Sequence, residues 1–317
     1  MNAPLFFPAD AHEGPVWVSE QCRLYYTTKT HLDGRRRVDI EYLDFSAFGN
    51  CDDHEFGRDL PDDAPARIKP HLWLHDAKMA NSMCLSKDRR QLLVCEQGYE
   101  DQAPSVLARY NLADKSRSVV IADYQGTPFN SLNKVIVTRA GHIIVSDPDY
   151  GFRQDFKPPP QLEPNLYILP KGGELEMFRC NLEMPHGLAL SPDERTLFVT
   201  DTSNDGAHGD DIDLKRHKSV WKFGFDPETA TISGPGEFCF QVDEGVPDGM
   251  ETTADCLLAG GGDAVYVANL AGELLGKIDV PNDAVNLALA GGGKHLFVTN
   301  DKGVLLYRDW RTFMQGV

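Results

Sequence analysis

Basic residues are scarce in this chain. Its 317 residues include 31 Lys and Arg against 48 Asp and Glu, which gives a formal net charge of −17. A negative field of this size repels nucleic-acid phosphates and anionic lipid surfaces, so neither is expected as a partner. A small-molecule substrate is compatible with this charge. The oligomeric state stays open.

Long apolar runs and ordered cysteine patterns are absent as well. No run of 18 apolar residues is present that would span a membrane, and the first residues, MNAPLFFPADAHEG, lack the basic and apolar segments of a signal peptide. The seven cysteines are odd in number and show no CxxC spacing. We therefore expect reduced, mostly buried thiols in a cytoplasmic protein.

The sequence shows little of the periodicity of amphipathic helices. It instead contains a repeated pattern of strands and turns. The segment HGLALSPDERTLFVTDT (186–202) has a polar residue, an apolar strand, a turn and a second apolar strand. Similar segments begin at Glu13, Asn81, Asn133, Asp248 and Asn286. Their starts are 38 to 68 residues apart, and a four-stranded propeller blade needs about 40–50 residues. The chain is therefore predicted to be all-β: a six-bladed β-propeller with four-stranded blades around a central channel, forming a single domain over residues 1–317.

A polar residue opens every copy of the repeat. Because the innermost strand of each blade lines the channel, we expect these side chains to converge at its mouth. They are Glu13, Asn81, Asn133, His186, Asp248 and Asn286. Carboxylates and amide oxygens are ligands for Ca²⁺, and an imidazole extends the choice to Zn²⁺ or Mn²⁺. One divalent cation is therefore expected, with Ca²⁺ favoured.

Several segments resemble the SMP-30/gluconolactonase family, which includes regucalcin-like proteins. They are EGPVW, FNSLNKVIV, VSDPDYG, PHGLALSPDERTLFVTDT and VPDGM, in the family's order, and the resemblance runs from about residue 13 to 307. It implies a six-bladed propeller that uses one divalent cation in its channel to hydrolyse lactones. The family's metal ligands fall on Glu13, Asn133 and Asp248, and His186 stands where the family usually has Asn.

A second difference from the family's pattern leaves two enzymatic hypotheses open. Lys134 stands where the family usually has Asp. In a metal-dependent lactonase, Asp248 would be the general base, His186 would share that task, and Lys134 would donate to the oxyanion. If Lys134 instead replaces the cation, the same groups favour a metal-independent isomerisation, dehydration or cyclisation, as in natural-product biosynthesis. A non-catalytic binding propeller is the third reading.

Further candidates lie in and beside the ring of polar residues. Asn81 and Asn286 belong to the ring, and Glu96 and Tyr150 stand where loops meet the predicted pocket; all four are candidate substrate-binding residues. The loop 150–165 contains three consecutive prolines and a fourth at position 164, and it is a candidate lid. The acidic run 201–218 does not have the EF-hand spacing and is expected to be a solvated loop.

Overall fold

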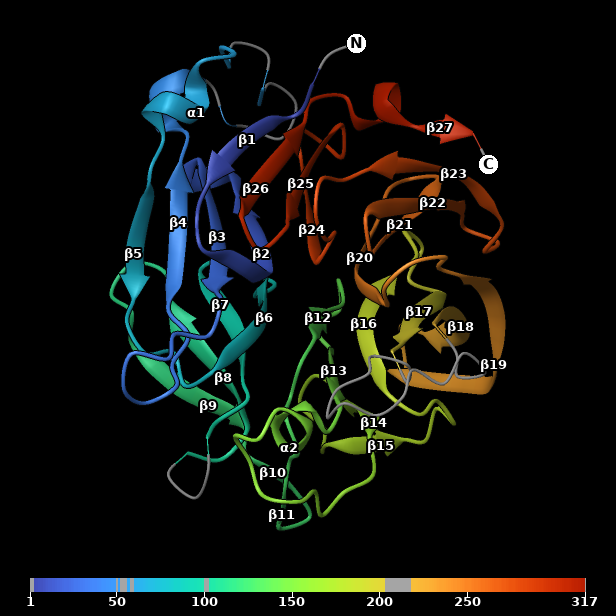
Figure 1. The fold of residues 1–317 in the computed structure, drawn as a ribbon. Helices are drawn as coiled ribbons and strands as arrows, with labels where there is room; N and C mark the ends of the chain where they lie inside the picture. Colours follow the sequence, from blue (N-terminus) through green and yellow to red (C-terminus); the bar gives the residue numbers. More distant parts are fainter. Residues whose placement is uncertain are drawn as a thin grey trace.

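The six predicted blades form a closed ring (Figure 1). The computed structural model describes residues 3–49, 51, 56–57, 60–99, 103–202 and 218–316. Each blade is an antiparallel sheet whose first strand lies next to the central channel. Neighbouring inner strands contact one another, so that β2, for example, contacts both β6 of the next blade and β24 of the last. The prediction of a six-bladed β-propeller is confirmed.

The strands of the first three blades follow the chain order. Blade 1 contains β2 (Ala11–Val18), β3 (Arg23–Thr28), β4 (Ile40–Asp44) and β5 (Pro70–Leu74). Blade 2 contains β6 (Ala80–Leu85), β7 (Gln91–Glu96), β8 (Val106–Asn111) and β9 (Arg117–Ile121). Blade 3 contains β12 (Val135–Val137), β13 (Ile143–Asp147), β14 (Asn165–Leu169) and β15 (Glu176–Phe178).

The other three blades include the strand that closes the ring. Blade 4 contains β16 (Pro185–Leu190), β17 (Thr196–Asp201), β18 (Ser219–Asp226) and β19 (Thr231–Gln241). Blade 5 contains β20 (Pro247–Thr252), β21 (Cys256–Gly261), β22 (Ala264–Asn269), β23 (Leu274–Asp279) and β27 (Gln315–Gly316). Blade 6 contains β24 (Asn286–Ala290), β25 (His295–Thr299), β26 (Gly303–Tyr307) and β1 (Leu5–Pro8).

Small elements lie outside the blades. They are the hairpin β10 (Asp123–Tyr124) and β11 (Thr127–Pro128), the short helices α1 (Ala64–Arg67) and α2 (Tyr150–Arg153), and single 3₁₀ turns at Ser19–Gln21, Ser46–Phe48 and Trp310–Phe313. Among the described residues, no helix has the length and apolar character needed to cross a membrane.

A shared turn explains why the repeated segments look alike. After the inner strand of blade 4, the Ser191 hydroxyl donates to the Asp193 carboxylate at 2.6 Å, and Glu194 adopts a left-handed φ of 56°. Blade 2 repeats this turn, with Ser86 donating to Asp88 at 2.6 Å. A hydroxyl that closes a turn onto an Asp two residues later competes with continued strand pairing, so the chain reverses there.

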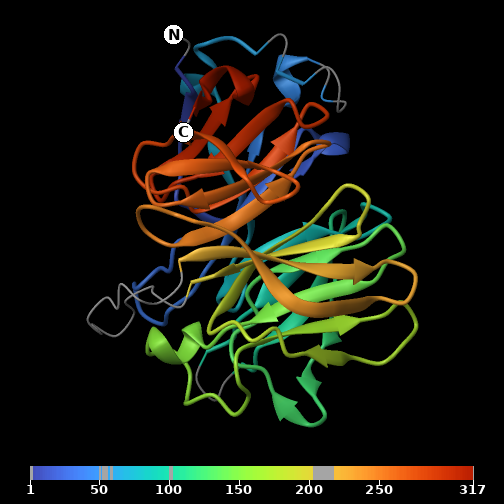
Figure 2. The same ribbon diagram turned by 90° about the vertical axis from the view of Figure 1, so that its right-hand side faces the viewer.

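The first described strand closes the ring. β1 pairs with β26 in an antiparallel register, so residues from both ends of the chain complete blade 6. Phe7 of β1 is fully buried and packs edge-on against Phe45 of blade 1, with ring centroids 5.3 Å apart. In both views the two chain ends lie on the same side of the ring (Figures 1 and 2). Closure leaves no sheet face of the end blades uncovered.

The cysteine prediction is wrong in one respect. Cys22 and Cys51 form a disulfide that links residues 29 positions apart in blade 1. The other five cysteines are free, and Cys95, Cys180 and Cys256 are buried. Odd number and irregular spacing gave no sign of the pair, because tertiary folding alone brings the two Cα atoms to 5.2 Å.

Candidate functional site

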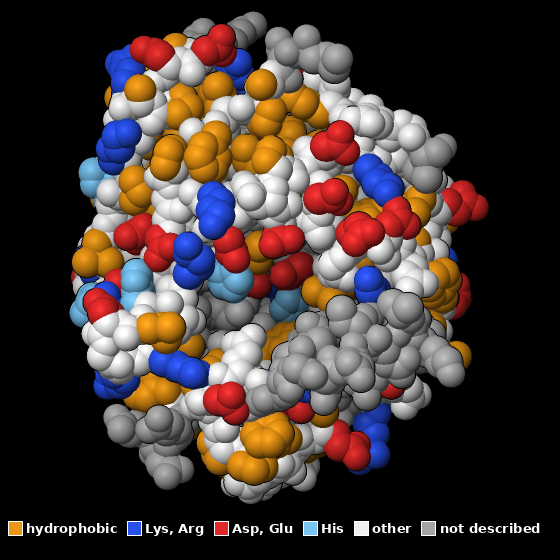
Figure 3. All heavy atoms as spheres, in the orientation of Figure 1, with side chains coloured by type: hydrophobic (Ala, Val, Ile, Leu, Met, Phe, Trp, Pro, Cys, Tyr) orange, Lys and Arg blue, Asp and Glu red, His pale blue; other side chains and the backbone are white. Residues whose placement is uncertain are grey.

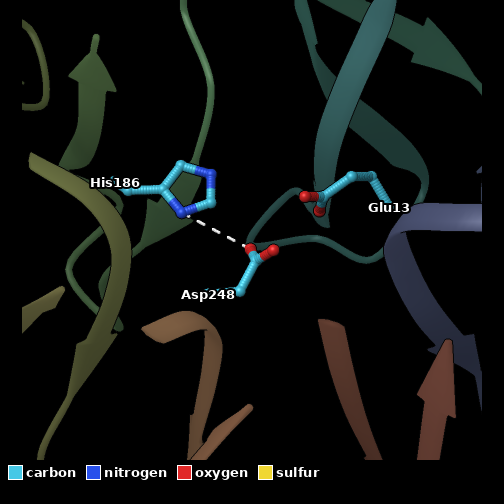
Figure 4. A group of neighbouring side chains, drawn as sticks. All are labelled: Glu13, His186 and Asp248. Atoms are coloured by element: carbon cyan, nitrogen blue, oxygen red, sulfur yellow. Dashed lines mark ion pairs between the residues drawn. The ribbon is translucent and has the colours of Figure 1, made fainter. Parts of the chain in front are cut away.

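Three side chains from three blades meet in the mouth of the channel (Figure 4). Glu13 comes from β2, His186 from β16 and Asp248 from β20. One ligand atom of each lies within 4.8 Å of the others, and His186 Nδ1 is 3.4 Å from Asp248 Oδ1. Glu13 is 3% exposed and His186 is 6% exposed. We call these residues the mouth cluster. Charged and histidine side chains surround a hollow on this face of the ring (Figure 3).

Irregular pairing at the start of four inner strands directs these side chains inward. Register shifts occur between Glu13 and Val16, Ala80 and Met83, Pro185 and Leu188, and Pro247 and Met250. Each shift contains one of the predicted polar residues. A β-bulge adds a residue and re-aims its neighbours, and such bulges are common beside functional sites.

Glycines next to the mouth cluster let the inner strands approach closely. A Cβ on Gly187 would lie 2.3 Å from the Asp248 carbonyl oxygen, and one on Gly249 would lie 2.2 Å from Asn286 Oδ1. Hydroxyls of the second strands then tie the blades together. Ser146 donates to the His186 carbonyl at 2.6 Å, and Thr200 donates to that of Asp248 at 3.4 Å. The backbone beneath the cluster is therefore held by its neighbouring blades.

The charge of Glu13 disfavours the ionised form of Asp248. Burial raises the pKa of Asp248 well above its usual range, and the negative charge of Glu13 raises it further, while Lys134 lowers it. Burial lowers the pKa of His186 to about 4, so its imidazole is neutral near neutral pH. A positive charge beside the cluster, such as that of Lys134 or of a bound cation, favours the ionised form of Asp248.

Lys134 and Asn286 connect to the same cluster. Lys134 is buried, and its ammonium donates to Asn286 Oδ1 at 3.4 Å. The side-chain amide of Asn286 in turn donates to the Glu13 carboxylate. Lys134 therefore points into the channel, an orientation that the sequence left open. Its positive charge lowers the pKa values of Asp248, His186 and Glu251.

The donor atoms of the mouth cluster fit a divalent cation. His186 Nδ1 and Asp248 Oδ1 are buried without a hydrogen-bond partner in the part of the chain that the structure describes, and so is Asn81 Oδ1 of the neighbouring blade. Unpartnered buried nitrogen and oxygen atoms are costly unless a ligand, ion or water occupies the space between them. An imidazole nitrogen with carboxylate and amide oxygens is a donor set that first-row divalent ions and Ca²⁺ accept.

The other predicted residues are placed differently. Asn133 is 2% exposed, with its backbone bonded to Ser82 and Ser146. The Tyr150 ring stands edge-on to the His186 ring, with centroids 5.3 Å apart. The Glu96 carboxylate is fully buried inside blade 2, where it accepts from Arg117 at 2.6 and 2.8 Å and from Tyr110. The structure therefore does not bring Glu96 to the mouth cluster.

Two predicted loops can now be placed. The acidic run lies almost wholly within 203–217, outside the described residues. In the proline-containing loop, Phe156 is 3% exposed and packs in the same hydrophobic cluster as Trp73 and Tyr99. An aromatic side chain anchored in this way contributes to the core, whereas Phe152 of the same loop is 39% exposed. The lid therefore stays a prediction.

Sequence reasoning missed charged groups around the mouth cluster. His12 Nδ1 lies 2.6 Å from Asp301 Oδ1, beside Glu13. Glu251 lies three residues after Asp248 and shares with Lys134 a cavity of about 700 Å³ lined by residues further along the inner strands. None of the mouth cluster lines this cavity, which opens toward the other end of the channel. The signal was available for Glu251, because it is a second carboxyl residue in the inner strand that begins with Pro247 and Asp248.

A closed six-bladed propeller with two carboxylates and an imidazole gathered in the mouth of its channel defines the class of protein to which this chain belongs. A family model described as the SMP-30/Gluconolactonase/LRE-like region matches residues 11–302, and the chain belongs to this family. The chain is 28% identical over 190 residues to a gluconolactonase from Zymomonas mobilis, which covers 56% of this chain and 49% of that protein. It is 25% identical over 185 residues to a lactonohydrolase from Aspergillus oryzae, covering 53% and 42%. The matches thus span about half the length of these relatives.

Solved structures support the same fold. A gluconolactonase from Xanthomonas campestris superposes with a TM-score of 0.73 at 25% identity, over 96% of this chain and 87% of that one. A calcium-binding regucalcin from Agrobacterium tumefaciens superposes with a TM-score of 0.66 at 14% identity, over 100% and 95%. The second likeness concerns the fold alone.

Proposed function

We propose that this protein is a metal-dependent hydrolase that opens a sugar lactone or another small cyclic ester in the channel mouth. The observation that carries the proposal is the mouth cluster itself, in which three ligand atoms lie within 4.8 Å and two of them are buried without a hydrogen-bond partner among the described residues. Glu13, His186 and Asp248 would hold the cation, with Asn133 as a fourth ligand. Ca²⁺ is the first choice, and the imidazole also admits Zn²⁺ or Mn²⁺.

The residues of the channel have separate tasks in this reaction. A bound cation supplies positive charge that stabilises the oxyanion formed when water adds to the lactone carbonyl. The positive charge of the cation would favour the ionised form of Asp248, which would then accept the proton of the attacking water, and the neutral imidazole of His186 would share this task. The ammonium of Lys134 donates to the oxyanion. Asn286 positions both Glu13 and Lys134, since its amide group bonds to each of them.

The orientation of Lys134 favours a second function on the same scaffold. A buried ammonium beside Asn286 places one positive charge near the two carboxylates without a metal ion. In that reading the channel carries out a metal-independent isomerisation, dehydration or cyclisation, with Lys134 and His186 handling protons. Under either reading we propose a small-molecule partner, because the net charge of −17 disfavours nucleic acid and anionic membranes.

The compartment is a separate proposal. The cytoplasmic assignment from the sequence stays a prediction, and the Cys22–Cys51 disulfide weighs against it because such bonds are rare in that compartment. Cell fractionation followed by thiol labelling of the two cysteines tests it. A labelled, reduced pair in the cytosolic fraction supports the assignment, and an oxidised pair outside the cytosol overturns it.

The metal content of Glu13→Gln separates the two catalytic readings. Purified without chelators or a histidine tag, the wild type should contain about one divalent ion per chain by plasma mass spectrometry, and the variant should bind it at least about 100-fold more weakly. Lactone hydrolysis should fall together with the metal content. Glu237→Gln, on an exposed side chain, is the matched control and should behave as the wild type.

A wild-type protein with less than about a tenth of an equivalent of metal would contradict the metal-dependent reading, provided that added Ca²⁺ or Zn²⁺ leaves its thermal midpoint unchanged. The metal-independent function would then be tested with Lys134→Met, which should lose activity while retaining its fold by circular dichroism.

A further inference from the structure

The cavity that Glu251 lines lies at the end of the channel opposite the mouth cluster. Its volume is about 700 Å³, and inner-strand residues of all six blades line it. It is also lined by the turns that follow the inner strands of blades 4, 5 and 6, through Ser191 and Pro192, Thr253 and Ala254, and Gly292 and Gly293. The inner strands begin beside the mouth cluster and end at these turns, so the cavity opens on the other face of the ring. We call it the far cavity.

The walls of the far cavity are largely apolar. Four inner strands each contribute an aliphatic residue at or next to their last position: Leu85, Val137, Leu190 and Leu289. All four side chains are partly accessible. Apolar surface that is left accessible in a concave site gains free energy when a ligand covers it. A volume of this size is also within the range of small-molecule sites.

Two carboxyl residues line the far cavity, and they differ in their partners. The Glu194 carboxylate accepts from the backbone N–H of Arg139 at 2.8 Å. Glu251 accepts no hydrogen bond from the described residues, and none of their basic nitrogens lies within 4.0 Å of its carboxyl oxygens; only burial and the more distant charge of Lys134 act on it. Glu251 is therefore the group in this cavity that lacks a partner.

The carboxyl group of Glu251 projects into the channel. The preceding residue on β20, Met250, packs in the hydrophobic cluster between blades 4 and 5, so Glu251 leaves the strand on the other side. It interacts electrostatically with Cys84 of blade 2 and Lys134 of blade 3, which line the far cavity from across the ring. Glu251 is half-buried. Because blades 4 and 6 cover both sheet faces of blade 5, solvent reaches Glu251 through the cavity.

Lys134 does not neutralise this carboxyl group at close range. Its ammonium donates to Asn286 Oδ1, and Asn286 bonds to Glu13 of the mouth cluster and does not line the far cavity. A carboxylate that has lost part of its water without gaining a donor is unfavourable, and a cationic donor on a ligand offsets that cost. The net charge of −17 also attracts cations to the molecule.

We propose that the far cavity is a second binding site, which takes a small organic amine in its ammonium form, with the ammonium on the Glu251 carboxylate and an apolar body against the ends of the inner strands. An ammonium only donates hydrogen bonds and an ionised carboxylate only accepts them, so the two groups are complementary. The site shares no residue with the mouth cluster and goes beyond the proposed lactone hydrolysis.

Calorimetric titration of the full chain with three molecules of one shape tests this site. Cyclohexylmethylamine, cyclohexylmethanol and cyclohexylacetate share a ring and a methylene group and end in an ammonium, a hydroxyl and a carboxylate. Burial raises the pKa of Glu251 to about 7, so at pH 8 it is mostly ionised while the amine stays protonated. The amine should bind at least about tenfold more tightly than the alcohol, and the carboxylate should not bind measurably.

Three results of this titration would overturn the proposal. They are equal affinities for the amine and the alcohol, tighter binding of the carboxylate, and no binding of the amine at millimolar concentration. Tighter binding of the carboxylate would show that Lys134 and not Glu251 selects the charge of the ligand.

Two variants locate the bound ammonium. Glu251→Gln keeps the size of the side chain and should weaken binding of the amine at least about tenfold, while binding of the alcohol changes by less than about threefold. Circular dichroism checks that its fold is retained. Glu13→Gln is the matched control, because the mouth cluster also contains carboxylates, and it should bind the amine as the wild type does. Loss of amine binding in Glu13→Gln with retention in Glu251→Gln would place the amine in the mouth cluster and overturn the proposal. Because the readout is binding of a probe, it is independent of lactone hydrolysis.

Discussion

At the scale of the residue, His186 sets the chemistry of the mouth cluster. Its buried, neutral imidazole supplies a nitrogen where the family resemblance of the sequence implies an asparagine, and nitrogen favours Zn²⁺ over Ca²⁺. His186→Asn should therefore shift the ratio of Ca²⁺ to Zn²⁺ affinity toward Ca²⁺ by about tenfold or more, measured by competition calorimetry. Tyr150→Phe keeps the ring against His186 and should leave the ratio unchanged. An unchanged ratio in His186→Asn would remove His186 from the ligand set.

Glu251 offers a prediction on pH and stability. Burial raises the pKa of this carboxyl to about 7, although the nearby Lys134 lowers it. In the unfolded chain the carboxyl ionises near pH 4.5, so the folded state holds a proton that the unfolded state lacks between about pH 4.5 and 7. The free energy of unfolding then falls as the pH rises through that window.

In Glu251→Gln the free energy of unfolding should not show this fall with rising pH. Its free energy of unfolding should exceed that of the wild type by about 1–2 kcal/mol at pH 8, and the difference should vanish near pH 4. Urea unfolding at several pH values measures both. Glu237→Gln is the control, because that side chain is exposed. A difference that does not change with pH would show that Glu251 ionises normally.

At the scale of the element, the bulged starts of the inner strands should be sensitive to small changes. Gly187→Ala places a methyl group 2.3 Å from the Asp248 carbonyl and 2.9 Å from Thr200 Oγ1, so the two blades must separate there. We expect a loss of about 2 kcal/mol in the free energy of unfolding together with weaker metal binding. Gly172→Ala, which has φ +75° but open space around it, should reduce stability without affecting the metal. Metal binding that survives Gly187→Ala would show that the cluster does not depend on this approach.

At the scale of the whole molecule, stability depends on closing the ring. A chain that begins after Pro8 loses β1, so β26 becomes an exposed edge and Phe7 leaves its contact with Phe45. The thermal midpoint measured by circular dichroism should fall by about 10 °C or more. Removing residues 315–317 is the matched control, because β27 adds only a fifth strand outside blade 5. Equal midpoints for the two truncations would show that β1 does not lock the ring.

The architecture could be predicted from the sequence because each blade contains the same local pattern of residues. The apolar inner strand, the hydroxyl–Asp turn and the polar first residue recur locally, so Glu13, His186 and Asp248 could be expected together before their positions were known. Their roles as ligands stay a prediction. Glu96 shows the limit of such reasoning. Its place at the end of a strand resembles that of a pocket residue. Its carboxylate, however, accepts hydrogen bonds from Arg117 and Tyr110 of its own blade.

Sequence alone therefore determined the all-β class, the number of blades and the set of polar residues at the starts of the inner strands, since these follow from local periodicity and turn chemistry. The pairing of β1 with β26, which closes the ring, came from the tertiary structure. Tertiary structure alone decided that Lys134 points inward toward Asn286 and that Cys22 meets Cys51. Each of these depends on segments far apart in the chain or on how far burial removes a charge from water. Such contacts leave no periodic trace in the sequence.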